Sequence, residues 1–145
     1  DFLVPNEIEL AGLLGWDEAR AKSVETLPPE EINKLALGLK SHQDQQVVVT
    51  LGQRGALLVS ETSPFLVEAP TVQATDSTGA GDAFVGTFAA RMASHGNVVN
   101  AMQHAVAAAS FSVMHAGTQT SYADRATLET LPETAAVPVG THPTP

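Results

Sequence analysis

The chain contains no cysteine and few residues of positive charge. Without thiols it cannot form disulfides, cysteine-ligated zinc fingers or iron–sulfur clusters, and it has no thiol nucleophile. Its 7 Lys and Arg residues stand against 16 Asp and Glu residues, which gives a formal net charge of −9 and argues against nucleic acid as a partner. Any bound anion must therefore be held locally, by backbone N–H groups or by a metal ion.

Long hydrophobic runs are also missing, since no apolar run approaches the roughly 18 to 20 residues that a membrane-spanning helix needs. A length of 145 residues suits a single domain. The chain opens with Asp1-Phe2-Leu3-Val4, which is typical of a strand end rather than of an initiator Met or a signal peptide. We therefore expect the rear part of a longer, cytoplasmic protein.

Hydrophobic patterning predicts strands and helices that alternate along the chain. Continuous apolar runs predict strands, and apolar stripes at helical spacing predict helices. The predicted strands are 2–4, 47–49, 56–59 and 65–67, and the predicted helices lie between Asn6 and Gly15, from Pro28 to Leu39, and over 82–93 and 98–114. The fold class is therefore α/β, with a partly parallel sheet flanked by helices.

The end of the chain has a different composition. Residues 132–145 hold four of the nine prolines, among Thr, Ala and Val. This composition predicts a flexible tail without chemistry, after a domain that covers residues 1–131.

The segment Asp76-Ser77-Thr78-Gly79-Ala80-Gly81-Asp82 carries the strongest chemical signal. It is a glycine-containing loop that enters a helix, and the first-turn N–H groups of Ala80, Gly81 and Asp82 have no partners within that helix. Such groups can bind a phosphate oxygen or the charge that develops in phosphoryl transfer. Asp82 can also take a proton from a hydroxyl, although an Asp at this position is often only a helix cap.

Three further motifs accompany this loop in the sequence. They are Asn6-Glu7-Ile8-Glu9, Thr50-Leu51-Gly52-Gln53-Arg54-Gly55 and Gly117-Thr118-Gln119-Thr120-Ser121-Tyr122. Together, in this order and at this spacing, the four motifs resemble those of the ribokinase-like (PfkB) sugar kinases. The resemblance covers residues 1 to about 130 and only the rear part of such a kinase, whose front part supplies most of the sugar pocket and a lid.

The resemblance implies transfer of the γ-phosphoryl group of ATP to a primary sugar hydroxyl, with O5 of D-ribose as the expected acceptor. Asp82 would be the catalytic base and would contact the sugar. Gly79, Ala80 and Gly81 would form the anion hole for the transferred group. ATP and a small sugar would be the partners, and the full-length protein would be a homodimer.

The resemblance also implies a nucleotide site and two metal ions. Glu9 would organise the water shell of Mg²⁺, and Val106 would replace the Asn or His that often lies beside adenine. The remaining nucleotide contacts would come from Asn6, Thr50, Leu51, Gly52, Gln53, Arg54, Gly55, Gly81 and Asp82. Oxygen atoms of Asp76, Thr78, Ser112, His115, Gly117 and Ser121 would bind K⁺.

Other interpretations remain open at this point. The chain could belong to a fructose or nucleoside kinase of the same family, or it could be a nucleotide-binding module without catalysis. Asn6 and Glu9 could serve only as a helix cap, Asp76 as a turn residue, and Ser121 as the cap of a short helix near Ala126. The five histidines show no metal-ligand spacing.

Overall fold

The computed structural model describes residues 1–117, 121–132 and 134–140. The chain divides into two compact units. Unit 1 consists of Asp1–Leu66 with Val137–Pro145, and unit 2 consists of Val67–Ala136.

A mixed sheet of five strands confirms the α/β prediction. The strands follow one another in space in chain order: β1 (Phe2–Leu3), β2 (Gln46–Thr50), β3 (Ala56–Leu58), β4 (Phe65–Val67) and β5 (Ala136–Pro138). β1 is parallel to β2, and β2 is antiparallel to β3. Val47, Val48 and Val49 of β2 are fully buried, as a continuous β-branched run predicts for a strand with both faces covered.

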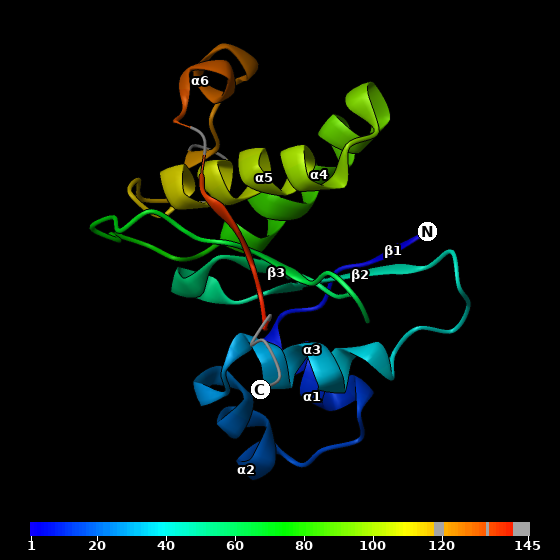
Figure 1. Ribbon diagram of the computed structural model, residues 1–145. Helices are drawn as coiled ribbons and strands as arrows, with labels where there is room; N and C mark the ends of the chain where they lie inside the picture. The colour runs from blue at the N-terminus through cyan, green and yellow to red at the C-terminus, as the bar shows by residue number, and fades with distance from the viewer. Residues whose placement is uncertain (118–120, 133, 141–145) are drawn as a thin grey trace. The chain divides into compact units, whose positions relative to one another are not determined.

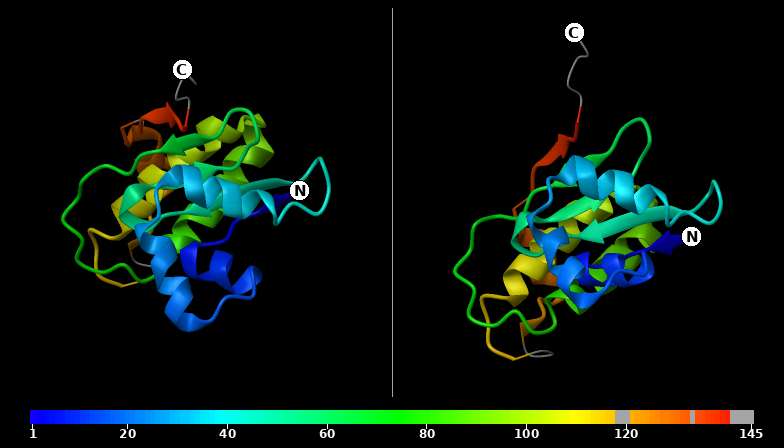
Figure 2. Two further views of the ribbon diagram at one scale, coloured as in Figure 1. Left: turned by 60° about the horizontal axis from the view of Figure 1, so that its bottom comes forward. Right: turned by 90° about the horizontal axis from the view of Figure 1, so that it is seen from below.

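Four helical segments of unit 1 precede β2 in the chain. They are α1 (Glu7–Leu13), α2 (Glu18–Ala21), the 3-10 helix η1 (Lys22–Thr26) and α3 (Pro29–Leu37). α1 and α3 lie on the same side of β2, as Figures 1 and 2 show. α3 begins with Pro29, whose fixed φ angle suits the first position of a helix. Two acidic residues, Glu30 and Glu31, follow in the first turn, where negative charge interacts favourably with the helix dipole.

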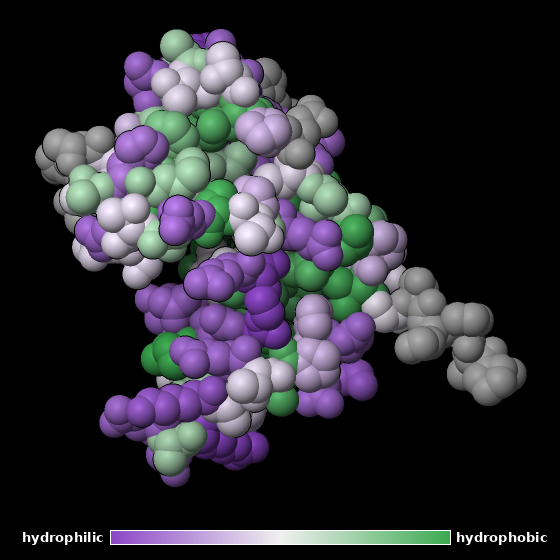
Figure 3. All heavy atoms as spheres, turned by 90° about the vertical axis from the view of Figure 1, so that its left-hand side faces the viewer, coloured by the Kyte–Doolittle hydropathy of each residue, from purple (hydrophilic) through white to green (hydrophobic). Residues whose placement is uncertain are grey.

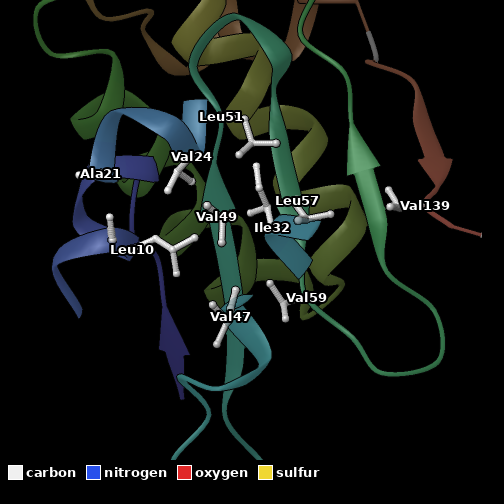
Figure 4. Close-up of a cluster of buried hydrophobic side chains, with 12 residues drawn as sticks. Leu10, Ala21, Val24, Ile32, Val47, Val49, Leu51, Leu57, Val59 and Val139 are labelled. Carbon is white, nitrogen blue, oxygen red and sulfur yellow. The ribbon is translucent and has the colours of Figure 1, made fainter. Parts of the chain in front are cut away.

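One hydrophobic core lies between these helices and β2 and β3 (Figure 4). Val47 and Val49 point into it, whereas Val48, on the opposite face of the strand, does not belong to this cluster. Leu10 of α1 and Ile32 of α3 are fully buried against it. Because the core includes side chains from α1, α3 and β2, it fixes the position of the chain where β1 and β2 end.

Unit 2 is built on two long helices that lie side by side, α4 (Ala80–His95) and α5 (Val98–Ser112), with the short α6 (Arg125–Thr130) after them (Figure 1). Phe84 and Phe88, one turn apart on α4, are buried and stacked with their ring centroids 6.1 Å apart. Val85, the residue after Phe84, is 45% exposed. Successive side chains of an α-helix are about 100° apart around its axis, so Val85 does not share the buried face of Phe84.

Some elements differ from the sequence predictions. The polar stretch after Gly15 contains α2 and η1, and Asp17 caps α2 by accepting a hydrogen bond from the N–H of Arg20. The structure also differs from the flexible tail predicted for 132–145, because residues 136–138 form β5. The Val139 N–H donates to the carbonyl of Pro64 at 2.9 Å, and the Val139 side chain is buried in the core of unit 1. Residues 141–145 of that segment lie outside the described residues.

The surface around α2 is largely hydrophilic. α2 lies lowest in Figure 1, and the lowest part of the molecule in Figure 3 is mostly purple. Across the described ranges, no helix combines the length and apolar character that a bilayer crossing requires.

The core of unit 1 generates a stability prediction. Ile32→Ala removes a fully buried side chain and leaves a cavity, so we expect the free energy of unfolding to fall by about 2–5 kcal/mol. Urea denaturation followed by circular dichroism measures this change. Leu13→Ala is the matched control, because the Leu13 side chain is 55% exposed and its loss should change the free energy by less than about 0.5 kcal/mol. Equal losses in the two variants would contradict this core.

Candidate active site

In unit 2 the carboxylate of Asp76 holds two chain segments together. One oxygen, Oδ1, accepts a hydrogen bond from the N–H of Thr78 at 2.9 Å, and the other, Oδ2, accepts one from the N–H of Gly117 at 3.3 Å. The carbonyl of Val113 accepts from the N–H groups of Thr75 and Asp76 at 2.7 and 3.1 Å. The loop before α4 is therefore fixed to the chain that follows α5 by hydrogen bonds.

These bonds lower the pKa of Asp76. The bond from the backbone N–H of Thr78 has the largest effect, the Thr78 side chain comes next, and the N–H of Gly117 adds to both. Each of these bonds favours the charged carboxylate. Asp76 is therefore ionised at neutral pH and supplies a negative charge beside this loop.

Five of the six residues predicted to bind K⁺ belong to this arrangement. Asp76 bonds directly to Thr78 and Gly117, and a turn after α5 joins the His115 N–H to the Ser112 carbonyl at 3.2 Å. The sixth, Ser121, is 1% exposed. A carboxylate, a hydroxyl and backbone carbonyls are the hard oxygen donors that suit an alkali-metal cation, so the residues present fit the expected ion.

The His115 ring has its own contacts. Its Nδ1 lies 3.0 Å from the carbonyl of Phe111, and the two rings lie 4.4 Å apart between centroids. The imidazole thus packs on Phe111 of α5, and the binding of a cation by the His115 carbonyl stays a prediction. Thr118, Gln119 and Thr120, which belong to the same motif, lie outside the described residues.

The start of α4 is the predicted anion hole. Gly79 precedes the helix with φ +83°, in the left-handed region that favours glycine, and the carbonyl of Gly79 accepts the first helical bond from Ala83 at 2.9 Å. The Ala80 N–H, which the sequence predicted to have no partner within the helix, donates to the carbonyl of Ser77, which precedes the helix, at 3.3 Å. The N–H groups of Gly81 and Asp82 lie in the first turn of the helix.

Asp82 lines a small pocket within unit 2. The pocket has a volume of about 240 Å³ and most of its wall is apolar. Its lining residues come from α4, α5, the chain before α6, and α6 itself: Asp82, Ala83, Gly86, Thr87, Ala108, Tyr122, Ala123 and Leu128. The Asp82 side chain is exposed, so its carboxylate is open to a ligand from solution.

In unit 1 the predicted nucleotide residues gather where β1 and β2 end. The two strands are parallel, and the Thr50 N–H donates to the Pro5 carbonyl at 3.0 Å, which places Asn6 beside Thr50. Ligands of α/β proteins commonly bind outside the carboxyl ends of parallel strands. The Asn6–Glu9 motif and the turn that follows Thr50 therefore lie side by side, and their contact with a nucleotide stays a prediction.

The turn between β2 and β3 depends on its glycines. The 3-10 helix η2 (Gly52–Arg54) forms most of this turn, and the Leu51 N–H donates to the Gly55 carbonyl at 2.8 Å. Gly52 has φ +54° and Gly55 has φ +103°, values that side chains with a Cβ rarely adopt. Gly52 is exposed and leaves the backbone open to a ligand there, whereas Gly55 is buried.

Three of the predicted ligand side chains, those of Asn6, Glu9 and Arg54, are already engaged within unit 1. Arg54 pairs with the Glu7 carboxylate at 2.7 Å and donates to the Leu27 carbonyl at 2.6 Å. Glu9 forms a capping box with Asn6, in which Glu9 Oε2 accepts from the Asn6 N–H and Asn6 Oδ1 accepts from the Glu9 N–H, both at 2.8 Å. The Arg54 guanidinium therefore stabilises the turn through its bonds to Glu7 and Leu27. In the Glu9 carboxylate, Oε2 is the atom that takes part in the capping box, and Oε1 does not.

The remaining site residues are less accessible or were missed. Val106 is 3% exposed in α5, so its expected contact with adenine stays a prediction. Tyr122 is the last residue of the motif 117–122, and no feature of the sequence indicates that it lines a pocket with Asp82. Within the described residues, no group of three or more His, Cys, Asp or Glu side chains could hold a metal ion.

Comparison with known proteins identifies the relatives of this arrangement. Residues 1–125 match the pattern of the pfkB family of carbohydrate kinases. The deoxyribokinase of Salmonella typhi is 41% identical over 122 residues, which are 84% of this chain and 37% of that protein. The ribokinase of Staphylococcus aureus is 32% identical over 123 residues, or 83% of this chain and 38% of that protein. The chain thus spans less than two-fifths of the length of these relatives.

Solved structures show the same fold. The ribokinase of Thermotoga maritima has a TM-score of 0.71 at 32% identity, over 89% of this chain and 41% of that one. The ribokinase of Arabidopsis thaliana complexed with ribose and ATP has a TM-score of 0.64 at 30% identity, over 89% and 39%. The phosphofructokinase-2 of Escherichia coli in complex with potassium has a TM-score of 0.72 at 25% identity, over 90% and 40%.

The Asp76 hydrogen bonds give a prediction for pH. We expect a carbon-detected NMR titration to find the pKa of Asp76 below 3.8, because two backbone N–H groups stabilise its charged form. Since the pKa is lowered on folding, the stabilisation is present above the unfolded value of 3.8 and is lost as the pH falls through the folded pKa. A pKa at or above 3.8 would show that these hydrogen bonds do not form in solution.

Proposed function

Because this chain belongs to the pfkB family of carbohydrate kinases, we propose that the protein transfers the γ-phosphoryl group of ATP to a primary sugar hydroxyl, O5 of D-ribose. The observation that carries the proposal is the loop from Asp76 to Gly79, which turns into α4 and leaves an exposed Asp82 in the first helical turn. Helix N-termini bind anions through free N–H groups and the helix dipole.

Asp82 acts as the base in this proposal. Its carboxylate lies in the first turn of α4, where a negative side chain interacts favourably with the helix dipole, and it is the group that accepts the hydroxyl proton. The N–H groups of Gly81 and Asp82 donate to the phosphoryl oxygens as charge develops on them. The Ala80 N–H joins them when its long bond to Ser77 gives way to the stronger phosphoryl acceptor.

The motifs of unit 1 bind the nucleotide in the same proposal. Asn6 and the turn 50–55 lie where parallel strands end, and the turn presents backbone rather than bulky side chains. Glu9 Oε1 takes no part in the capping box, so it is suited to accept hydrogen bonds from the water shell of Mg²⁺. Mg²⁺ would neutralise charge on the phosphates when bound. The complex of the Arabidopsis ribokinase with ribose and ATP supports ATP as the phosphoryl donor.

K⁺ is the expected cation beside the anion-hole loop. The Asp76 carboxylate is ionised, and the carbonyl-bearing residues around it provide hard oxygen donors. Bound there, the cation would offset the Asp76 charge next to the phosphoryl group. The potassium complex of the Escherichia coli phosphofructokinase-2 supports the choice of ion. A cytoplasmic location and a homodimer of the full-length protein remain predictions.

A second sugar is favoured by one observation. The deoxyribokinase of Salmonella typhi is 41% identical to this chain, compared with 32% for the ribokinase of Staphylococcus aureus. The two sugars share the O5 acceptor and differ at C2, so the chemistry at Asp82 would be unchanged. 2-Deoxy-D-ribose is therefore the alternative acceptor.

A substrate panel tests the activity and separates the two sugars. The full-length gene product is assayed for sugar-dependent ADP formation with D-ribose, 2-deoxy-D-ribose, D-fructose and fructose 6-phosphate, in K⁺ and in Na⁺. We expect ribose to give the highest kcat/KM, and K⁺ to raise kcat by about tenfold. Preference for 2-deoxy-D-ribose would select the alternative, and no turnover with any of these sugars would contradict the kinase proposal.

Replacement of the base tests its role. We expect Asp82→Asn in the full-length gene product to lower kcat by about 10²–10⁴-fold while the Kd of an ATP analogue changes little, because the amide keeps the shape but cannot accept the proton. Glu129→Gln is the matched control, since this carboxylate is 56% exposed on α6 of the same unit. Near-normal turnover of Asp82→Asn would remove Asp82 from the proposed role.

A further inference from the structure

Tyr122 lies directly against the backbone of Gly79. A Cβ atom added to Gly79 would lie 2.8 Å from the Tyr122 hydroxyl oxygen, 3.3 Å from its Cε1 and 3.4 Å from its Cζ. Gly79 is also left-handed, with φ +83°. The position thus requires glycine for two separate reasons, its backbone angle and the space that the tyrosine ring occupies.

The same ring forms part of the wall of the Asp82 pocket. Tyr122 and Asp82 both line this pocket, and the Tyr122 side chain is 36% exposed. The preceding residue, Ser121, is 1% exposed, which anchors the backbone from which the ring extends. Tyr122 therefore touches the turn into α4 and borders the space in front of the carboxylate.

We propose that Tyr122 is a positioning residue that keeps Gly79 in its left-handed turn and thereby fixes the direction of the Gly81 and Asp82 N–H groups. The inference rests on the proposed kinase function and deepens it. A preorganised set of donors stabilises developing charge without a reorganisation cost, and small misplacements of such donors lower rates strongly. A tyrosine ring suits this task because it is rigid and has few torsions to restrain.

Among the described residues, the Gly79 carbonyl is held by the Ala83 N–H at 2.9 Å, and the other hydrogen bonds near the turn act on its neighbours. The Ala80 N–H bond to Ser77 is long at 3.3 Å, and the Asp76 bonds act on Thr78 and Gly117 rather than on Gly79. The Tyr122 side chain is 36% exposed, so most of the ring is buried and its loss also removes buried apolar area. We therefore expect its loss to loosen the turn locally and to lower the global stability to some extent, so exchange at the turn must be compared with exchange at an internal reference.

Hydrogen exchange tests the contact without any catalysis. The Ala83 amide donates to Gly79 at 2.9 Å, so its protection reports on the turn, and the Ala101 amide, bonded to Asn97 at 2.9 Å in the first turn of α5, is the internal reference. In the full-length gene product we expect Tyr122→Ala to speed exchange at Ala83 by about tenfold relative to Ala101. Tyr122→Phe, which loses only the nearest atom, should speed it less. Unchanged exchange at Ala83 in both variants would overturn the proposal.

Kinetics supply the second readout. We expect Tyr122→Ala to lower kcat by about tenfold and to leave the KM for ATP within about twofold, with Tyr122→Phe between it and wild type. Arg125→Ala is the matched control, because its side chain is 94% exposed on the nearby α6. An unchanged kcat, or a raised KM alone, would contradict a positioning role.

The two readouts separate the failure of this inference from the failure of the proposed function. If the wild-type protein phosphorylates no sugar, the kinase proposal fails, and exchange at Ala83 still decides whether Tyr122 holds the turn. If wild type is active while both Tyr122 variants match it in exchange and in kcat, only the Tyr122 inference fails. If the Tm shows that Tyr122→Ala does not fold, Tyr122→Phe still tests the inference, because it is also expected to speed exchange at the Ala83 amide, by a smaller factor.

Discussion

At Gly79 the chain turns from a hydrogen-bonded loop into α4 with φ +83°, and the donors of the proposed anion hole follow within the next three residues. Their direction depends on this turn, because each N–H at a helix start points along the axis that the turn sets. The Asp76 carboxylate holds the loop on one side through Thr78 and Gly117. The order of this site therefore comes from a charged hydrogen-bond acceptor and a glycine rather than from a hydrophobic core.

Local sequence signals predicted most of the fold. The β-branched run Val47–Val49 and the Pro29 helix start are strong because the chain can satisfy them with near neighbours. The sequence did not predict the short α2 and β5, because neither has a local pattern that identifies it. A helix of four residues has no apolar period, and β5, which contains Pro138, depends on pairing with a strand about seventy residues earlier, which no local pattern reveals.

The same distinction between local patterns and contacts that are distant in the sequence applies to the site. The loop 76–82 and the turn 50–55 were visible because glycine marks places where the backbone must bend or lie open, and the structure places positive φ angles at Gly52, Gly55 and Gly79. The engagement of Arg54 by Glu7, forty-seven positions away, could not be predicted, since a guanidinium in a ligand motif and one that braces a turn look the same in sequence. The contact of Tyr122 with Gly79 could not be predicted either, because these two residues are also far apart in the sequence.

NMR tests most directly whether the first turn of α4 binds the phosphates of a nucleotide. A non-hydrolysable ATP analogue is titrated with Mg²⁺ into the ¹⁵N-labelled full-length gene product. We expect saturable shifts of the Gly81 and Asp82 amide resonances, with the Ala101 amide in α5 unchanged. Binding of the analogue that leaves Gly81 and Asp82 unshifted, or no binding by the folded protein, would contradict this expectation.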